Sequence, residues 1–299
     1  MARYAAGVDI GASSIKTGLF NERWELTHRC AVIDSRTLES GDELVRRIQA
    51  SIETGLKDLG GTLTDLAGIG IGSPGPMDIN RGIILETPNI PILTQFPLKE
   101  RMIQASQVPV WLDNDGNVFA LGEAHLGAGR GYPYVLAVTL GTGFGWGIVL
   151  NGQIHHGATG TAAEYGPTPW QEDGRTWEDD VSIRGIMGTF HALGGQGETP
   201  QDVSRLADKG DEAAVKAWER YGMVLGLALT HAVNLLDPHV IVVGGAIVGA
   251  WDHFTPAMLA TLHRYLWAPP REALKVLPSQ LGDEAALYGA VSQVAFQED

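Results

Sequence analysis

The residues best suited to chemistry lie in an acidic segment of the chain. The segment Asp113-Asn114-Asp115-Gly116-Asn117 follows a short apolar run and precedes a stretch with helical character. In open α/β sheets, ligand sites usually lie where a strand ends and a helix begins. A carboxylate at such a place could orient an attacking hydroxyl group and accept its proton. Asp and Asn are also common in turns and at helix N-caps, so the segment alone leaves both interpretations open.

Two glycine-containing turns could bind phosphate groups. They are Asp9-Ile10-Gly11-Ala12-Ser13-Ser14-Ile15-Lys16 and Thr139-Leu140-Gly141-Thr142-Gly143-Phe144-Gly145. Backbone N–H groups in such turns can hold phosphate oxygens, and glycine lets the backbone approach closely. Asp9 ends a strand, where its carboxylate could hold Mg²⁺ directly or through water. Either turn alone could be a hairpin turn that binds no ligand. The two matching turns together are stronger evidence for phosphate binding than either turn alone.

The two turns belong to an internal repeat. The run Gly7-Val8-Asp9-Ile10-Gly11, followed by Leu19-Phe20-Asn21, matches Ala137-Val138-Thr139-Leu140-Gly141, followed by Val149-Leu150-Asn151. Every matched residue is offset by 130 positions, as Val8 is from Val138. Each copy reads as a strand, a turn and a returning strand, which predicts two similar α/β domains with a cleft between them.

Strands and helices alternate around these segments. We expect strands at 4–10, 15–20, 24–33, 66–73, 108–112, 134–154 (a pair), 239–244 and 274–277. We expect helices at 41–59, 117–126, 181–193, 200–208, 211–236, 250–267 and 283–296. The helix at 41–59 has apolar residues three and four apart, which places them on one face. This alternation predicts an α/β fold with largely buried sheets.

Composition excludes several classes of protein. The chain has 299 residues and a net charge of −14, which opposes binding to nucleic acid or to anionic membranes. Cys30 is the only cysteine, so one chain can form neither a disulfide nor a Cys-rich metal site. The N-terminus lacks a signal-peptide pattern, and no apolar run reaches the roughly 18 residues of a membrane span. We therefore expect a cytoplasmic protein without a nucleic-acid or membrane partner.

Together these segments resemble the ROK family of sugar kinases and related repressors, over nearly the whole chain. That family has an actin-like (ribonuclease H-like) ATPase fold of two α/β domains. The first turn resembles its first phosphate loop, with Ala12 in place of a glycine. The other similar segments are Gly70-Ile71-Gly72-Ser73-Pro74-Gly75-Pro76-Met77-Asp78, Pro88-Asn89-Ile90, Asn114-Asp115-Gly116-Asn117, Ala120-Leu121-Gly122-Glu123, Thr139-Leu140-Gly141-Thr142-Gly143, Gly244-Gly245 and Gly282-Asp283-Glu284-Ala285-Ala286-Leu287-Tyr288-Gly289-Ala290.

The resemblance implies roles for residues of this chain. It implies that Asp115 is the catalytic base and that the sugar is bound by Gly72, Asn89, Asn114, Glu164 and Glu178. It implies that ATP and Mg²⁺ are bound by Asp9, Gly11, Ala12, Ser13, Lys16, Thr139, Gly141, Thr142, Gly143, Gly244 and Gly245. The expected activity is transfer of a phosphoryl group from ATP to a hexose, glucose or a close relative, at the 6-hydroxyl, as in glycolysis. A homodimer or homotetramer is also expected, with domains at 1–116 and 117–283 and a final helix, 284–299, packed back on the first domain.

One segment departs from the family pattern. Family members carry Gly-Glu-x-Gly-His, then a zinc-binding cysteine cluster and a Glu, whereas this chain reads Ala163-Glu164-Tyr165-Gly166-Pro167. Because residues 157–190 contain no Cys and His191 lies beyond them, we expect no structural zinc. We expect packing and restricted backbone freedom at Pro167, Pro169, Trp170 and Trp177 to hold this loop instead. The adjacent His155 and His156 are interpreted as an exposed loop.

Two alternatives to an ATP-dependent kinase remain. A sugar sensor could keep the fold without turnover, since the family includes repressors and the histidine, a sugar contact in the family, is missing. A kinase could use polyphosphate in place of ATP, although a polyanion needs a basic track that this acidic chain does not offer.

Overall fold

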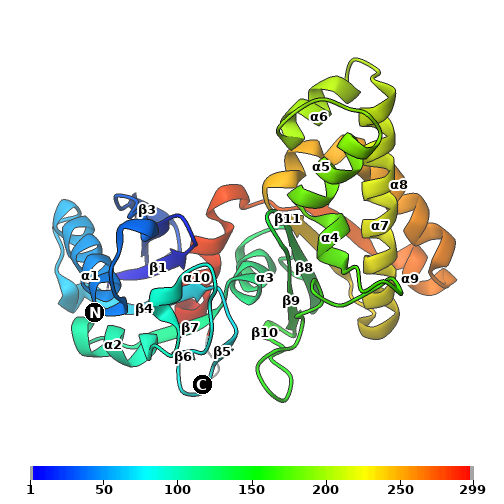
Figure 1. Ribbon diagram of the computed structural model, residues 1–299. Coiled ribbons are helices and arrows are strands. Elements are labelled where there is room, and N and C mark those ends of the chain that lie inside the picture. Colours follow the sequence, from blue (N-terminus) through cyan, green and yellow to red (C-terminus); the bar gives the residue numbers. More distant parts are fainter. Residues whose placement is uncertain (1–2, 297–299) are drawn as a thin grey trace.

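Two five-stranded sheets form the framework of the computed structural model, which describes residues 3–296 (Figure 1). The strand orders are β3-β2-β1-β4-β7 and β10-β9-β8-β11-β12. The first sheet contains β1 (Tyr4–Ile10), β2 (Ile15–Asn21), β3 (Leu26–Arg29), β4 (Leu66–Ser73) and β7 (Val110–Asn114). The second contains β8 (Tyr134–Leu140), β9 (Phe144–Leu150), β10 (Gln153–Ile154), β11 (Val240–Gly244) and β12 (Lys275–Pro278). A small separate ribbon pairs β5 (Met77–Asp78) with β6 (Ile83–Ile84).

The two sheets are built alike, as the internal repeat predicts. In each, a hairpin (β1–β2 or β8–β9) is antiparallel, while the central strand pairs in parallel with β4 or β11 on its other side. The predicted offset of 130 is wrong for the returning strands, however. Tyr4 pairs with Asn21 whereas Tyr134 pairs with Leu150, because the first turn spans 11–14 and the second only 141–143. Asn21 therefore corresponds to Leu150 and not to Asn151.

Helices α1 (Gly41–Asp58) and α2 (Leu98–Ser106) pack on each other and against the first sheet. Ser40 caps the N-terminus of α1, since its side chain accepts a hydrogen bond from the backbone N–H of Glu43 at 3.2 Å. The apolar face predicted for this helix is buried at Leu44, Ile48, Ile52 and Leu56. The sequence did not predict α2, in which few apolar residues recur.

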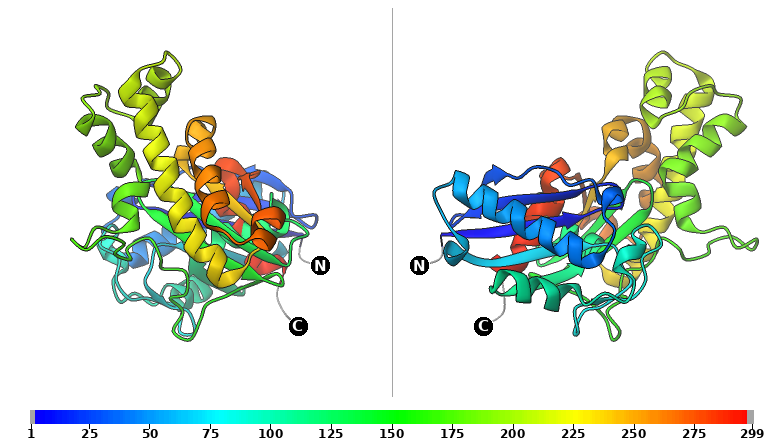
Figure 2. Two further views of the ribbon diagram at one scale, coloured as in Figure 1. Left: turned by 90° about the vertical axis from the view of Figure 1, so that its right-hand side faces the viewer. Right: turned by 60° about the vertical axis from the view of Figure 1, so that its left-hand side comes forward.

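A group of helices covers one side of the second sheet and shares a hydrophobic core with it (Figure 2). They are α4 (Trp177–Val181), α5 (Ile183–Ala192), α6 (Pro200–Ala207), α7 (Glu212–Leu236), α8 (Trp251–Tyr265) and α9 (Ala268–Ala273). The helix predicted at 181–193 was given the wrong first residue. Val181 ends α4, and the extended Ser182 caps α5, which begins at Ile183. Short 3₁₀ helices occur at Ser35–Thr37, Leu63–Asp65, Pro91–Leu93, Ala246–Ala250 and Gly282–Glu284. None of the helices in residues 3–296 is both long and apolar enough to span a bilayer.

Helices α3 (Asp115–Leu126) and α10 (Ala285–Ala295) lie between the two sheets (Figure 1). The C-terminal α10 packs against β1 and β4 of the first sheet as well as against α3. Glycine makes this contact possible, since a Cβ at Gly70 would overlap the carbonyl group of Ala290 and a Cβ at Gly289 that of Val118. The exact domain limits given above stay a prediction.

Candidate active site

Two pockets meet at Asp115, which lines both. One has a volume of about 440 Å³ and is lined by Asp9, Lys16, Thr139, Gly244 and Gly245, among others. The other has a volume of about 450 Å³ and is lined by residues 74–76, 114, 145, 146, 161, 163 and 164. We call them the phosphate pocket and the polar pocket. A group bound in one pocket can therefore reach a group bound in the other beside the Asp115 carboxylate.

The local sequence fixes the position of Asp115. Strand β7 ends at Asn114, whose side-chain oxygen accepts the backbone N–H of Gly116 at 2.9 Å and so caps α3. Asp115 Oδ1 accepts the same N–H at 2.8 Å. A Cβ at position 116 would lie 2.5 Å from the carbonyl oxygen of Trp146, so glycine lets α3 approach β9 here.

The carboxyl group of Asp115 is accessible but recessed. It is exposed to solvent, yet the surrounding protein displaces enough water that desolvation raises its pKa, while the hydrogen bond from Gly116 acts in the opposite direction. A carboxylate with a raised pKa is a stronger proton acceptor, which suits a general base.

Asp9 supplies a second carboxylate, in the phosphate pocket. It lies directly across the β1–β2 hairpin from Lys16. The pKa of Asp9 is raised to about 6, mainly by desolvation; Lys16 acts to lower it and Asp115 acts to raise it. Within residues 3–296 no hydrogen-bond donor contacts the Asp9 carboxylate. The pocket is thus lined by three carboxylates (Asp9, Asp115 and Asp283) and one lysine, an arrangement that favours a bound cation.

The donors of the phosphate pocket fit Mg²⁺ better than zinc. Mg²⁺ is commonly held by one or two carboxylates, with water and substrate phosphates completing its ligands, and Asp9 can serve in this way. Structural zinc needs four protein ligands. In the described part of the chain, no three His, Cys, Asp or Glu side chains group closely enough to hold a metal ion.

The structure gathers only some of the residues predicted to bind ATP. Asp9, Lys16, Thr139, Gly244 and Gly245 line the phosphate pocket. The predicted residues of the two glycine turns do not line this pocket. Each turn is partly exposed to solvent and directly follows a strand, β1 or β8, that contributes a lining residue. These turn residues are Gly11, Ala12, Ser13, Gly141, Thr142 and Gly143. Phe119, Ser279, Asp283 and Ala286 also line this pocket and were not predicted individually. Asp283 and Ala286 could have been found from the segment Gly282 to Ala290, which resembles the family pattern.

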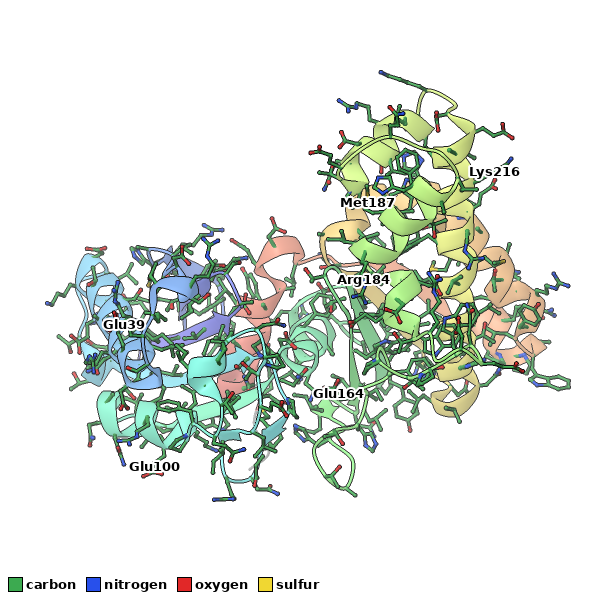
Figure 3. The ribbon with its side chains drawn as sticks, in the orientation of Figure 1. Glu39, Glu100, Glu164, Arg184, Met187 and Lys216 are labelled. Atoms are coloured by element: carbon green, nitrogen blue, oxygen red, sulfur yellow. The ribbon has the colours of Figure 1, made fainter. Side chains whose placement is uncertain are left out.

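Only some of the residues predicted to bind sugar line the polar pocket. Asn114 and Glu164 line the polar pocket, and Glu164 lies near the junction of the two halves (Figure 3). Desolvation raises the pKa of Glu164, with smaller contributions from Asp115 and Glu178. Trp146 and Thr161 also line the pocket, and nothing in their sequence context indicates it.

Three predicted sugar ligands lie outside that lining. Gly72 is inside β4, where its backbone packs closely against Val118. Asn89 is exposed in the loop before α2. Glu178 Oε2 accepts the backbone N–H of Phe144 at 3.0 Å and therefore holds the second glycine turn. Their part in sugar binding stays a prediction.

Aromatic stacking holds the loop that lacks the cysteine cluster, as predicted for its tryptophans. Trp170 stacks on the buried Trp177 with ring centroids 4.8 Å apart, and its indole N–H donates to Asp180 at 3.1 Å. Pro167 and Pro169 are exposed, so they add no buried packing, and their restriction of the backbone stays a prediction.

The interpretation of His155 and His156 as an exposed pair is also wrong for one of them. His155 is exposed, but His156 is half-buried, with its Nε2 atom 2.6 Å from Asp113 Oδ2.

Comparisons with known proteins agree with this geometry. The chain is 30% identical to a glucokinase of Halalkalibacterium halodurans, with 99% of this chain and 96% of that protein covered. The ROK hexokinase structure from Thermus thermophilus has a TM-score of 0.81 and 28% identity, with 97% of each chain covered. A ROK family glucokinase from Streptomyces griseus, in complex with glucose and AMPPNP, has a TM-score of 0.78 and 28% identity, over 96% of this chain and 97% of that one.

These structures share the actin-like ATPase fold of two α/β halves described above, so the predicted fold class is confirmed. The ROK family itself matches residues 5–296, which is nearly the whole chain. This protein therefore belongs to the ROK family.

Proposed function

We propose that this protein is an ATP-dependent hexose kinase that phosphorylates glucose or a close relative at the 6-hydroxyl. The observation that carries the proposal is the position of Asp115, a residue that lines both the phosphate pocket and the polar pocket. A base at this junction can contact the hydroxyl of one substrate while that hydroxyl faces the phosphate of the other.

The phosphate pocket suits the triphosphate of ATP. Gly244 and Gly245 offer backbone without side chains, and Lys16 supplies positive charge to the phosphates. Asp9 would hold Mg²⁺, which neutralises phosphate charge when it is bound. Without a cation, the carboxylates of Asp9 and Asp115 would repel the nucleotide.

The polar pocket suits a sugar. Each hydroxyl of a hexose both donates and accepts hydrogen bonds, and Asn114 and Glu164 provide a donor and acceptors for them. Asp115 would orient the 6-hydroxyl and take its proton as the oxygen bonds to the γ-phosphorus and the bond to ADP breaks. The products are ADP and the sugar phosphate. Closure of the cleft around both substrates would bring Asn89 nearer and exclude water as a competing acceptor.

The decisive experiment measures ADP release from Mg-ATP with and without each of a panel of hexoses and N-acetylhexosamines. We expect release to depend on one or two sugars, and we expect Asp115→Asn to abolish it while a sugar still raises the melting temperature. Repeating the assay with polyphosphate tests the donor, and light scattering tests the expected homodimer or homotetramer.

A sugar sensor is the second candidate, because Pro167 stands where the family has a sugar-contacting histidine. If no sugar releases ADP while one of them raises the melting temperature, the sensor replaces the kinase.

A further inference from the structure

A pair of side chains connects the two halves of the molecule beside the candidate site. Asp113 lies in β7 of the first sheet and is 4% exposed, whereas His156 follows β10 at the edge of the second sheet. The distance from His156 Nε2 to Asp113 Oδ2 is 2.6 Å. Neither residue lines the phosphate pocket or the polar pocket, and the proposed reaction uses neither of them directly.

The Asp113 end of this pair controls the turn that carries the base. Its other oxygen, Oδ1, accepts the backbone N–H of Asn114 at 2.7 Å and the side-chain amide of Asn117 at 2.9 Å. Asn114 caps α3 and lines the polar pocket, and Asp115 comes next in the chain. A buried carboxylate with three hydrogen bonds is held firmly, so the orientation of Asp113 is transmitted to the turn.

The His156 end controls the loop that carries Glu164. The carbonyl oxygen of His156 accepts the backbone N–H of Ala162 at 3.1 Å, which closes the loop just before Ala163 and Glu164. Ala163 has a φ of 72°, a left-handed conformation that a residue other than glycine adopts only when its surroundings require it. The hydrogen bond that His156 donates to the Asp113 carboxylate raises the pKa of His156 and so favours the charged imidazolium.

We propose that His156 is a positioning residue that, through Asp113, sets the placement of the Glu164 loop relative to Asp115 and thereby the fit of the sugar. The inference rests on the proposed function, since it treats the polar pocket as the sugar site. Positioning of this kind matters because misplacing a reacting group by about 1 Å can cost about a hundredfold in rate.

The test compares His156→Ala, Asp113→Asn and the double variant with His155→Ala, a control at the exposed neighbouring histidine. We expect each single variant to lower kcat/KM for the sugar by about tenfold or more. The KM for Mg-ATP should stay within about twofold, because the loop that His156 closes carries Glu164, which lines the polar pocket and not the phosphate pocket. The double variant should lose no more than the worse single variant, because two members of one contact act as a unit.

His156→Gln separates positioning from a general role in folding. The Gln side chain can still donate a hydrogen bond to Asp113, so we expect it to recover most of the sugar kcat/KM that His156→Ala loses. Three results would overturn the inference: unchanged sugar kinetics in His156→Ala, additive losses in the double variant, or equal losses for sugar and Mg-ATP.

The experiment also distinguishes this inference from the proposed function. If the wild-type protein phosphorylates no sugar, the affinity for whichever hexose raises its melting temperature replaces kcat/KM. A loss of that affinity in His156→Ala, with recovery in His156→Gln, would support the positioning role even without kinase activity. An unchanged affinity would overturn it.

Discussion

Replacing Asp9 with Asn should stabilise the free protein while abolishing kinase activity. Asp9 is partly buried at the end of β1, and its pKa is raised from 3.8 to about 6, mainly by desolvation. Such a shift means that the folded protein disfavours the charged carboxylate relative to the unfolded chain. Asn has nearly the same shape and no charge, so it removes this penalty, but it also removes the carboxylate proposed to hold Mg²⁺.

The size of the effect follows from the pKa shift. A shift of about two units corresponds to about 3 kcal/mol at about 1.4 kcal/mol per unit. The Asp9 side chain keeps some contact with water, which weakens the effect, so we expect a gain of about 1–2 kcal/mol in the free energy of unfolding near pH 7.5. Each kcal/mol raises the melting temperature of a protein of this size by about 2–4 °C.

The sign of the pH dependence can be tested as well. Because the folded-state pKa of Asp9 is raised, its penalty is fully present above about pH 6 and fades as the pH falls toward 3.8. The advantage of Asp9→Asn should therefore be largest at pH 7–8 and vanish near pH 4. Mg-ATP should raise the melting temperature of the wild-type protein but not that of the variant.

Thermal unfolding across this pH range, with and without Mg-ATP, is the measurement. Glu172→Gln is the matched control, because Glu172 is exposed and its substitution also removes one negative charge. The reasoning fails if Asp9→Asn is no more stable than the wild type at pH 7.5, if Glu172→Gln gains as much, or if the gain persists at pH 4.

Three further variants probe the base, the loop and the central helix contact. Asp115→Asn should lower kcat at least about a hundredfold with hexose binding retained, and a near-normal kcat would remove this residue from its role. Trp177→Ala should cost about 3 kcal/mol of stability in denaturant titrations, because it opens a cavity under the stacked loop; a loss below about 1 kcal/mol would show that stacking does not hold it. Gly289→Ala should destabilise the protein more than Ala295→Gly near the end of the same helix, because its Cβ would overlap the carbonyl group of Val118; equal melting temperatures would contradict this.

The sequence predicted the parts of the site that depend on local chain features. Asp115 and Asn114 could be found because polar residues at the end of a strand and the start of a helix form a local pattern. The two turns could be found because glycines repeat within matching strand pairs. Helix α2 was missed because Leu98 and Met102 are its only buried apolar residues, which is too little periodicity to indicate a helix.

The remaining features depend on contacts between distant segments. Glu178 contacts Phe144 across 34 positions, and His156 contacts Asp113 across 43. Neither spacing has a local signature, since each contact arises only when α4 or the loop after β10 packs on a separate strand. The one-residue difference between the two hairpins also escaped sequence matching, because Asn21 and Asn151 happen to be identical residues.

Backbone contacts at the centre of the molecule explain why the two pockets share one carboxylate. Helix α3 begins at Asp115, and a Cβ at its Gly122 would lie 2.8 Å from the Cα of Gly289 in α10. Helix α10 in turn packs on β1, the strand that ends beside Asp9, where a Cβ at Gly7 would lie 2.5 Å from the carbonyl oxygen of Leu287. Backbone packed against backbone adjusts less than side chains do. The separation of the two carboxylates is therefore set by the helix pair, whereas Glu164 and Asn89 lie on loops outside this packing.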